Sequence, residues 1–138
     1  MAESIRDLMT ANPCSVDVEK SVAYAAKMMR DEDVGLAPIV EGDRLVGTLT
    51  DRDIAIRVVA EGKDPEQTTV REVASTNVVT IDPQQDLDEA LRLMAKHQVR
   101  RLPVVEEDGR LVGVVAQADV AREGDDKQTG QVVQEISE

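Results

Sequence analysis

The chain contains almost no aromatic side chains. Its 138 residues include one tyrosine and neither phenylalanine nor tryptophan, so it offers no aromatic platform on which single-stranded bases could stack. Basic residues are also scarce: 16 lysines and arginines stand against 28 aspartates and glutamates, for a formal net charge of −12. Binding to nucleic acid needs a basic footprint. We therefore expect no nucleic-acid partner.

Cysteine and histidine occur once each, as Cys14 and His97. This excludes a disulfide within the chain and a zinc site of the usual Cys/His kind, and we predict no metal site. Cys14 lies in an apolar-alternating segment, which predicts a buried structural side chain. His97 falls near the end of a predicted helix, where a cation suits the helix dipole. A surface or capping role is favoured for it over ligand contact.

Long apolar runs are absent as well, and no segment approaches the roughly 20 residues that span a bilayer. Residues 1–4 lack the charged and apolar regions of a signal peptide. We therefore expect a soluble cytoplasmic protein without a membrane partner. Hydrophobic residues still make up 41% of the chain. They can fill the core of one compact unit, or of two small units that share it, with aliphatic side chains.

The sequence contains one pattern twice, and such repeats decide the fold. Residues 5–43 align with 70–108 at an offset of 65, and 44–56 align with 110–122 at an offset of 66. The matched pairs include Arg6 and Arg71, Pro38 and Pro103, Gly47 and Gly113, and Asp53 and Asp119. So many matches in one order are hard to obtain by chance.

Each copy predicts the same elements in the same order. They are a short helix (5–9 and 70–74), a short strand (14–16 and 78–81), an amphipathic helix, a hairpin (36–49 and 102–115) and a last helix (51–60 and 117–122). Ser4 and Thr69 are the expected caps of the short helices, because each has an acid three residues on. The amphipathic helices carry apolar residues at i, i+3, i+4 and i+7. These are Val22, Ala25, Ala26 and Met29 in one copy, and Leu87, Ala90, Leu91 and Met94 in the other.

The two copies set the expected domain boundaries. Residues 1–62 form the first domain, 63–69 a polar linker and 70–123 the second domain, and residues 124–138 form an acidic, mobile tail. A unit of about 55 residues rarely supports itself. We therefore predict that the copies pack on each other about a pseudo-twofold axis.

The stretch Arg44–Ile54 and its repeat resemble the CBS domain, as do the opening Ile5–Thr10 and the stretch Val99–Val105. The similarity covers residues 5–60 and 70–122, and it is specific because the ordered set occurs twice. The chain resembles a stand-alone tandem CBS pair, or Bateman module. The resemblance implies an α/β (α+β) fold of two β-α-β-β-α repeats. It also implies a regulatory module without catalytic residues, whose clefts between the repeats bind AMP, ADP, ATP or an S-adenosyl compound.

The family's nucleotide motif, Gly-x-x-Thr/Ser-x-x-Asp, is matched in the first copy by Gly47, Thr50 and Asp53. Gly47 lets another backbone or a ligand approach the strand closely. Thr50 stands where a helix begins, so exposed N–H groups and its hydroxyl favour a phosphate. Asp53 could accept from both ribose hydroxyls, and Arg52 could offer its charge to a phosphate. The alternative is a cap, with Thr50 as the capping residue and Asp53 favouring the dipole; the two roles are compatible.

The second copy departs from this motif. Asp119 keeps the carboxylate, but Ala116 has no hydroxyl. Arg100 and Arg101 could compensate by reaching a phosphate, or they could be solvated surface charges. We therefore predict unequal sites, of which the first is the better nucleotide site.

The last helix of the first copy, Ile54–Ala60, is apolar on more than one face, which predicts cover by a partner. CBS pairs commonly dimerise through such helices, so we expect a homodimer.

The leading interpretation is a ligand-sensing module that binds an adenine nucleotide and acts on an unknown regulated protein. The alternative is a structural dimerisation or protein-interaction module with vestigial nucleotide clefts. An enzyme is disfavoured, because the sequence shows no nucleophile–base pair, P-loop or metal cluster.

Overall fold

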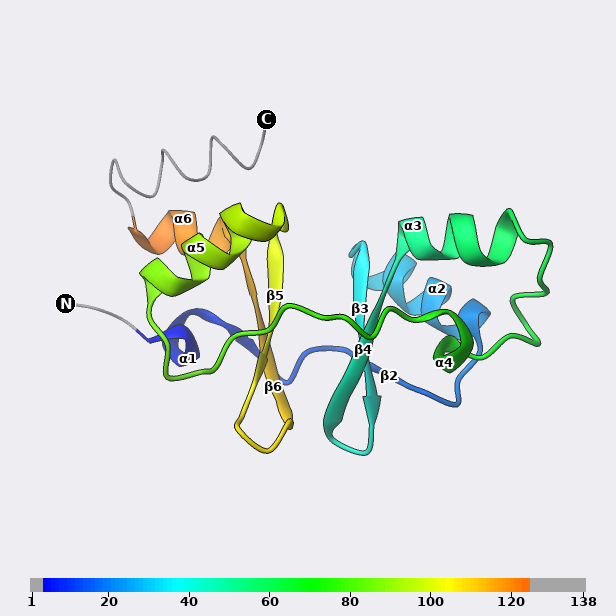
Figure 1. Ribbon diagram of the computed structural model, residues 1–138, viewed down its shortest axis with the longest axis horizontal. Coiled ribbons are helices and arrows are strands. Elements are labelled where there is room, and N and C mark those ends of the chain that lie inside the picture. Colours follow the sequence, from blue (N-terminus) through cyan, green and yellow to red (C-terminus); the bar gives the residue numbers. More distant parts are fainter. Residues whose placement is uncertain (1–3, 125–138) are drawn as a thin grey trace. The chain divides into compact units, whose positions relative to one another are not determined.

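Both repeats contain an opening helix, a long helix, a hairpin and a last helix in the same order (Figure 1), and the first repeat has two further short strands within residues 10–17. The structure is a computed structural model that describes residues 4–124 of the chain. The expected tail, 124–138, lies outside the described residues except for Gly124. The elements in chain order are α1 (Ile5–Leu8), β1 (Thr10–Ala11), β2 (Val16–Asp17), α2 (Val22–Glu32), β3 (Leu36–Glu41), β4 (Arg44–Thr50), α3 (Asp51–Ile54), the π-helical η1 (Ala55–Val59), α4 (Val70–Val73), α5 (Leu87–His97), β5 (Arg101–Val105), β6 (Leu111–Ala116) and α6 (Gln117–Gly124).

The two predicted hairpins form, and they match in register. β3 pairs antiparallel with β4, and β5 with β6. Pro38 stands opposite Thr48, and Pro103 stands opposite Val114, at the expected offsets of 65 and 66. Each hairpin has a register shift one residue further on. The repeat in the sequence is thus confirmed as a repeat in structure.

The long helices α2 and α5 begin and end as their sequences dictate. The side chain of Ser21 accepts from the backbone N–H at the third position of α2, and that of Asp86 does the same for α5, both at 3.0 Å. Each helix ends at a left-handed residue, Asp33 or Gln98. The buried faces contain Val22, Ala25 and Met29 in α2, and Ala90, Leu91 and Met94 in α5. The predicted amphipathic helices are therefore confirmed.

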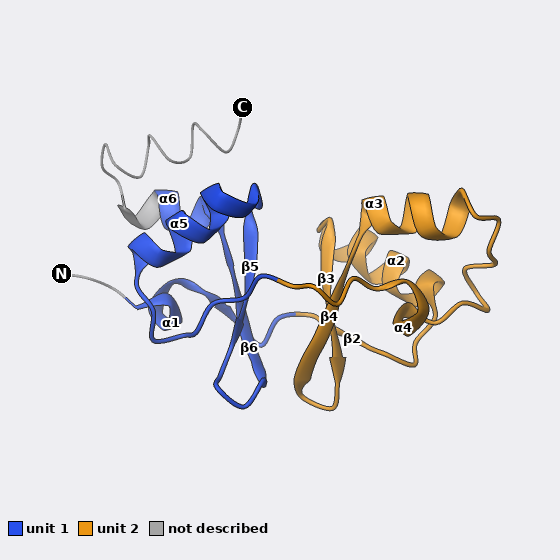
Figure 2. Cartoon of the chain, viewed as in Figure 1, with its two compact units in different colours: residues 1–13, 79–138 blue, residues 14–78 orange. Residues whose placement is uncertain are grey.

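The compact units of the chain do not coincide with its sequence repeats (Figure 2). One unit comprises residues 14–78, and the other comprises 1–13 together with 79–138. The opening helix of each repeat therefore belongs to the unit that holds the hairpin of the other repeat. Each unit has its own three-stranded sheet, β2-β3-β4 in the first and β1-β6-β5 in the second.

Backbone hydrogen bonds explain why each opening helix docks where it does. In the 14–78 unit, the N–H of Val70 donates to the carbonyl of Lys20 at 2.8 Å, and that of Arg71 donates to Val18 at 3.2 Å. The other unit has two equivalent bonds, from the Ile5 N–H to the Gln85 carbonyl at 2.8 Å and from the Arg6 N–H to the Pro83 carbonyl at 3.0 Å. Each donor lies 65 residues earlier than its counterpart, and each acceptor lies 65 residues later. Since both partners shift by the same offset, the docking itself is part of the repeat.

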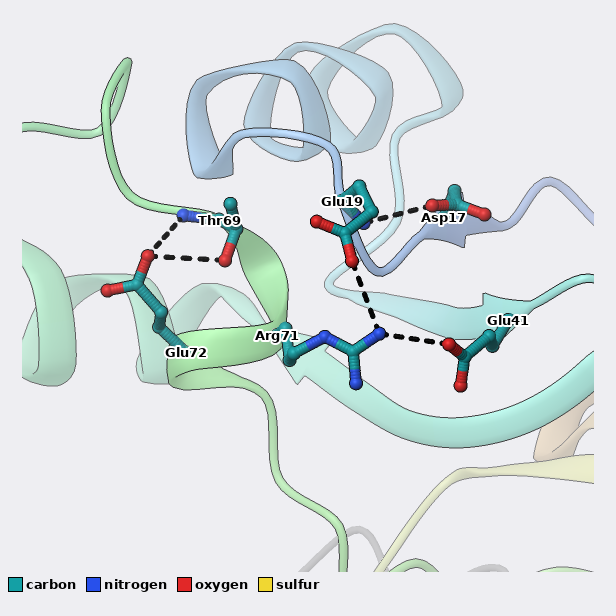
Figure 3. A network of polar contacts seen from close by, with 6 residues as sticks. All are labelled: Asp17, Glu19, Glu41, Thr69, Arg71 and Glu72. Carbon is teal, nitrogen blue, oxygen red and sulfur yellow. Dashed lines mark hydrogen bonds and ion pairs between the residues drawn. The ribbon is translucent and has the colours of Figure 1, made fainter.

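An ion pair accompanies each docked helix. Figure 3 shows Arg71 between two acids, with its Nη2 atom 3.1 Å from Glu41 Oε2 and 3.3 Å from Glu19 Oε2. The hydrogen bond to Glu41, followed by that to Glu19, raises the pKa of Arg71. In the other unit Arg6 contacts Glu106 at 2.8 Å. Exposed pairs of this kind add little stability, so the backbone hydrogen bonds contribute more to the docking of the helix than these pairs do.

Some sequence expectations were wrong in detail. The strand predicted at 78–81 is reduced to a single parallel bridge between Ile81 and Val104. The last helix of the first repeat is α-helical only to Ile54 and continues as η1. The polar linker at 63–69 is held by backbone bonds to the start of α2, for example from Val22 N–H to the carbonyl of Thr68 at 2.8 Å.

Cys14 is exposed, which corrects the prediction of a buried side chain. β2 begins only at Val16, so Cys14 precedes the alternation that buries Val16 and Val18. Desolvation, followed by the effect of the nearby Glu32 carboxylate, raises the pKa of the Cys14 thiol. His97 ends α5 on the surface, as expected. No helix within residues 4–124 is long and apolar enough to cross a membrane.

The cap of α4 gives a prediction about pH. Glu72 accepts from the backbone N–H of Thr69 at 2.9 Å and from its hydroxyl at 3.2 Å (Figure 3). The backbone bond is the main reason why the pKa of Glu72 lies below its ordinary value of 4.5. Because the folded pKa is lowered, this stabilisation is present above the unfolded pKa and is lost as pH falls through the folded pKa.

We expect Glu72→Ala to lower the free energy of unfolding near neutral pH, and the difference from wild type to shrink as the pH falls below 4.5. Urea unfolding followed by circular dichroism over a pH series measures this. Glu61→Ala, which removes an exposed acid outside the cap, is the control. A difference that stays constant on acidification would show that the Glu72 carboxylate does not stabilise the helix through its charge.

Candidate functional site

The predicted motif of the first repeat lies where β4 ends and α3 begins. Thr50 Oγ1 accepts from the backbone N–H of Asp53 at 3.0 Å, and the backbone N–H of Thr50 donates to Asp53 Oδ2 at 2.9 Å. The two residues therefore form a capping box, the alternative that the sequence left open. Thr50 and Asp53 can still form hydrogen bonds with a ligand, because the Thr50 hydroxyl keeps its own proton and each carboxylate oxygen can accept more than one hydrogen bond.

Asp53 has a second partner that sequence reasoning missed. Arg57, one turn further on, places its Nε atom 3.9 Å from Asp53 Oδ1, and only 16% of the Asp53 side chain is exposed. Arg57 Nη1 also donates to the carbonyl of Val73, the last residue of α4, at 2.9 Å. The i,i+4 spacing of Asp53 and Arg57 was the available signal. The contact with Val73 had no sequence signal.

Gly47 is needed because another backbone passes over the strand. A Cβ atom at this position would lie 2.7 Å from the carbonyl oxygen of Ser75. Beside it, Thr48 N–H donates to Ser75 O at 2.9 Å, and Ser75 N–H donates to Thr48 O at 2.8 Å. The sequence predicted that either another backbone or a ligand approaches Gly47, and the structure shows the approach of the Ser75 backbone. Gly113 is placed alike, since a Cβ there would lie 2.9 Å from Thr10 O.

Arg52 is exposed on α3. Its backbone N–H donates to Asp51 Oδ1 at 2.8 Å. Its guanidinium makes no ion pair within the part of the chain that the structure describes. The side chain is therefore available to an anion, although nothing holds it toward Thr50 or Asp53.

The junction of the second repeat keeps the geometry and loses a polar group. Asp119 Oδ2 accepts from the backbone N–H of Ala116 at 3.3 Å, but Ala116 has no hydroxyl group where the first repeat has that of Thr50. The carbonyl of Arg100 accepts from Gln117 N–H at 2.8 Å, just as that of Gly35 accepts from Asp51 N–H at 3.1 Å in the first repeat.

The side chains of Arg100 and Arg101 are exposed. Arg101 begins β5 opposite Ala116, so both arginines adjoin the second junction. The structure thus brings Thr50, Asp53 and Gly47 together in one unit. Arg100, Arg101 and Asp119 belong to the other.

One hollow adjoins the first junction, and another lies at the turn end of the β5–β6 hairpin, away from the second junction. The first, of about 410 Å³, has Met29, Val34, Asp51 and Ile54 in its lining. The other, of about 630 Å³, lies beside the β5–β6 turn and is lined mostly by acids and amides, including Asp82. The acidic hollow would repel a phosphate. Among residues 4–124, no group of three or more His, Cys, Asp or Glu side chains could hold a metal ion.

The fold is thus a doubled unit of helices and a hairpin, and in each copy an acid caps the junction between the last strand and the last helix. The CBS-domain family model matches residues 5–60 and 70–126. The chain therefore belongs to the CBS-domain family, as a tandem pair.

Its relatives include other proteins of this kind. The CBS domain-containing protein YhcV of Bacillus subtilis is 46% identical over 118 residues, which cover 86% of this chain and 83% of the relative. Hypoxic response protein 1 of Mycobacterium tuberculosis is 44% identical, over 85% of this chain and 82% of the relative. These matches confirm the predicted similarity to stand-alone CBS pairs.

Solved structures agree with this assignment. The crystal structure of Hypoxic Response Protein I with two coordinated zinc ions superposes with a TM-score of 0.80 at 43% identity, covering 87% of this chain and 98% of that chain. The CBS domain pair of protein MJ0100, solved with 5-methylthioadenosine and S-adenosyl-L-methionine, gives a TM-score of 0.77 at 28% identity, covering 91% of this chain and 98% of that chain.

Gln117 is a further polar residue at the second junction. It is 9% exposed, and its buried Nε2 atom has no hydrogen-bond partner among the described residues. An unpaired buried donor costs stability, whereas an apolar group of similar shape does not.

We expect Gln117→Met to raise the free energy of unfolding by about 1 kcal/mol, as measured by urea denaturation. Gln84→Met, at an exposed position, should leave it nearly unchanged. A loss of stability in Gln117→Met would show that a bound water or another group already satisfies the amide.

Proposed function

We propose that this chain is a regulatory module without catalytic activity of its own, which binds an adenine nucleotide or an S-adenosyl compound at the strand–helix junction of its first repeat. The observation that carries the proposal is the pairing of Thr50 with Asp53. It puts a hydroxyl and a largely buried carboxylate side by side at the start of α3. The adenosyl compounds in the MJ0100 structure support this class of ligand.

The chemistry of the pair suits a nucleoside. A ribose diol presents two donors, and Asp53 has lone pairs left for both after accepting from the Thr50 N–H. The Thr50 hydroxyl proton can turn toward a phosphate or sugar oxygen, and the exposed Arg52 can add a positive charge for an anionic ligand. Gly47 contributes by packing, because it allows the Ser75 backbone to fix the end of β4.

The second repeat is the weaker site in this proposal. Ala116 offers no hydroxyl, so the second junction has the carboxylate of Asp119 but no counterpart of the Thr50 hydroxyl. Arg100 and Arg101 would have to supply attraction to a phosphate from exposed positions. We therefore place the principal ligand at the first junction.

We also propose that the protein forms a homodimer and passes ligand binding on to a regulated protein. Large apolar side chains are exposed on the 14–78 unit: Tyr24 on α2 is 48% exposed, and Ile56 and Val59 on η1 are 46% and 70% exposed. Val58, between them, is fully buried in the core. Such side chains favour cover by a second copy. The net charge of −12 argues against a nucleic acid as the target.

Calorimetry with AMP and ATP tests the ligand site. We expect Asp53→Ala to weaken binding at least about tenfold, because a hydrogen bond to a charged group is worth about 1.5–3 kcal/mol. Asp119→Ala should cost less. Glu66→Ala is the control: it removes the same charge away from both junctions, and so measures the repulsive field of the acidic protein alone.

Equal losses from Asp53→Ala and Asp119→Ala would refute the inequality of the sites. Absence of binding by AMP, ADP, ATP and S-adenosylmethionine at millimolar concentration would favour a structural dimerisation module with vestigial sites. Release of phosphate from ATP would contradict the proposed lack of catalytic activity.

Light scattering tests the dimer. We expect twice the 15.1 kDa mass of the chain at micromolar concentration. We also expect the double change Ile56→Asp and Val59→Asp to give the monomer mass with an unchanged circular dichroism spectrum. A wild-type protein that already has the monomer mass would exclude the dimer, and a double variant that stays dimeric would exclude η1 as the contact.

A further inference from the structure

Arg57 joins the candidate ligand carboxylate to the end of a helix from the other repeat. Its Nε atom lies 3.9 Å from Asp53 Oδ1, and its Nη1 atom donates to Val73 O at 2.9 Å. The guanidinium is 48% exposed, whereas the Asp53 side chain is 16% exposed. A half-exposed cation thus holds a mostly buried acid on one side and a backbone carbonyl on the other.

The Val73 carbonyl that accepts from Arg57 lies close in sequence to the β-bridge between Ser75 and Thr48 of β4. Val73 ends α4, where carbonyls lack partners within the helix, and its side chain is buried in the core. Two residues later Ser75 exchanges both backbone hydrogen bonds with Thr48. Thr48 is in turn two residues from Thr50, which caps α3 together with Asp53. The contacts therefore form a closed loop within the 14–78 unit.

The second repeat has no counterpart of Arg57. With the offset of 66, the matching position is Glu123, so the charge is reversed there. Asp119 keeps its bond with the Ala116 N–H. An arginine at this position, which in the first repeat contacts both Asp53 and Val73, is therefore present in the first repeat only.

We propose that Arg57 is the positioning residue of the first junction. It orients Asp53 for a ligand diol and couples occupancy of that carboxylate to the end of α4 and to the Thr48–Ser75 bridge. This inference rests on the proposed nucleoside site. A diol that donates to Asp53 Oδ1 shares that oxygen with Arg57. Ligand binding therefore affects the contacts of Arg57 with Asp53 and Val73, which we call the brace, and the brace affects ligand binding. Linkage makes the effect reciprocal: if the brace promotes binding, binding stabilises the brace.

The test uses the full chain with adenosine and AMP, which share the ribose and differ in the phosphate. We expect Arg57→Gln to weaken both ligands by the same factor, about three- to tenfold, and Arg57→Lys to recover part of the loss. Lys27→Gln is the control: it removes the same charge from an exposed position on α2 of the same unit and should leave adenosine binding unchanged.

Hydrogen exchange provides the second measurement. In wild type, adenosine should slow exchange of the Ser75 N–H, and in Arg57→Gln this slowing should be lost even at saturating adenosine. A merely structural role would lower stability in Arg57→Gln without changing affinity or the response of Ser75 to ligand.

The outcomes separate this inference from the proposal beneath it. Weakening of AMP alone would put Arg57 on the phosphate and overturn the positioning role. Unchanged affinity for both ligands would overturn it while the nucleoside site stands. If wild-type protein binds neither adenosine nor AMP, the nucleoside site fails and the positioning role fails with it.

Discussion

The pair of backbone hydrogen bonds between Thr48 and Ser75 is the contact on which the described part of the 14–78 unit depends. It requires a residue without a side chain at Gly47, because any Cβ would meet the Ser75 carbonyl. It fixes the end of β4, and so the point at which Thr50 can begin a helix. It also holds the chain just after α4, where Arg57 reaches the Val73 carbonyl. Packing and the candidate site thus share one constraint.

The same constraint operates in the other unit with different residues. There β1 lies antiparallel to β6, with Thr10 opposite Val114 and Ala11 opposite Gly113. Thr10 and Ser75 differ by the repeat offset of 65. The segment that crosses the hairpin, a strand at Thr10 and a single bridge at Ser75, therefore forms one repeated assembly with the glycine beneath it and the docked helix. Each assembly combines an opening segment from one repeat with a hairpin from the other. This is the physical reason why the compact units and the sequence repeats have different boundaries.

Sequence patterns predicted what is local in this chain. Helical periodicity located α2 and α5, the turn residues located both hairpins, and the acids three residues after Ser4 and Thr69 identified the caps. The resemblance of the repeated motifs to a tandem CBS pair was confirmed by the family match. The period-2 alternation wrongly predicted a buried Cys14, because a pattern of alternation does not show at which residue strand pairing begins. The strand predicted at 78–81 did not form, because this segment pairs with β5 only through the bridge from Ile81 to Val104. Neither β1 nor the contact of Arg57 with Val73 could be foreseen, because each depends on a residue far away in sequence.

The two repeats differ where a ligand would be held and agree where the chain must pack. Gly47 and Gly113 agree, as do Pro38 with Pro103 and Arg6 with Arg71, and each of these positions serves a strand pairing or a docked helix. The differences include three positions in and just before the last helix, where Thr50, Asp51 and Arg57 are replaced by Ala116, Gln117 and Glu123. A packing constraint acts on both repeats alike, since each hairpin needs a crossing strand. Binding imposes no such symmetry, because one competent junction suffices to sense a ligand. If the proposed ligand site is correct, these three replacements are what distinguish the first junction from the second.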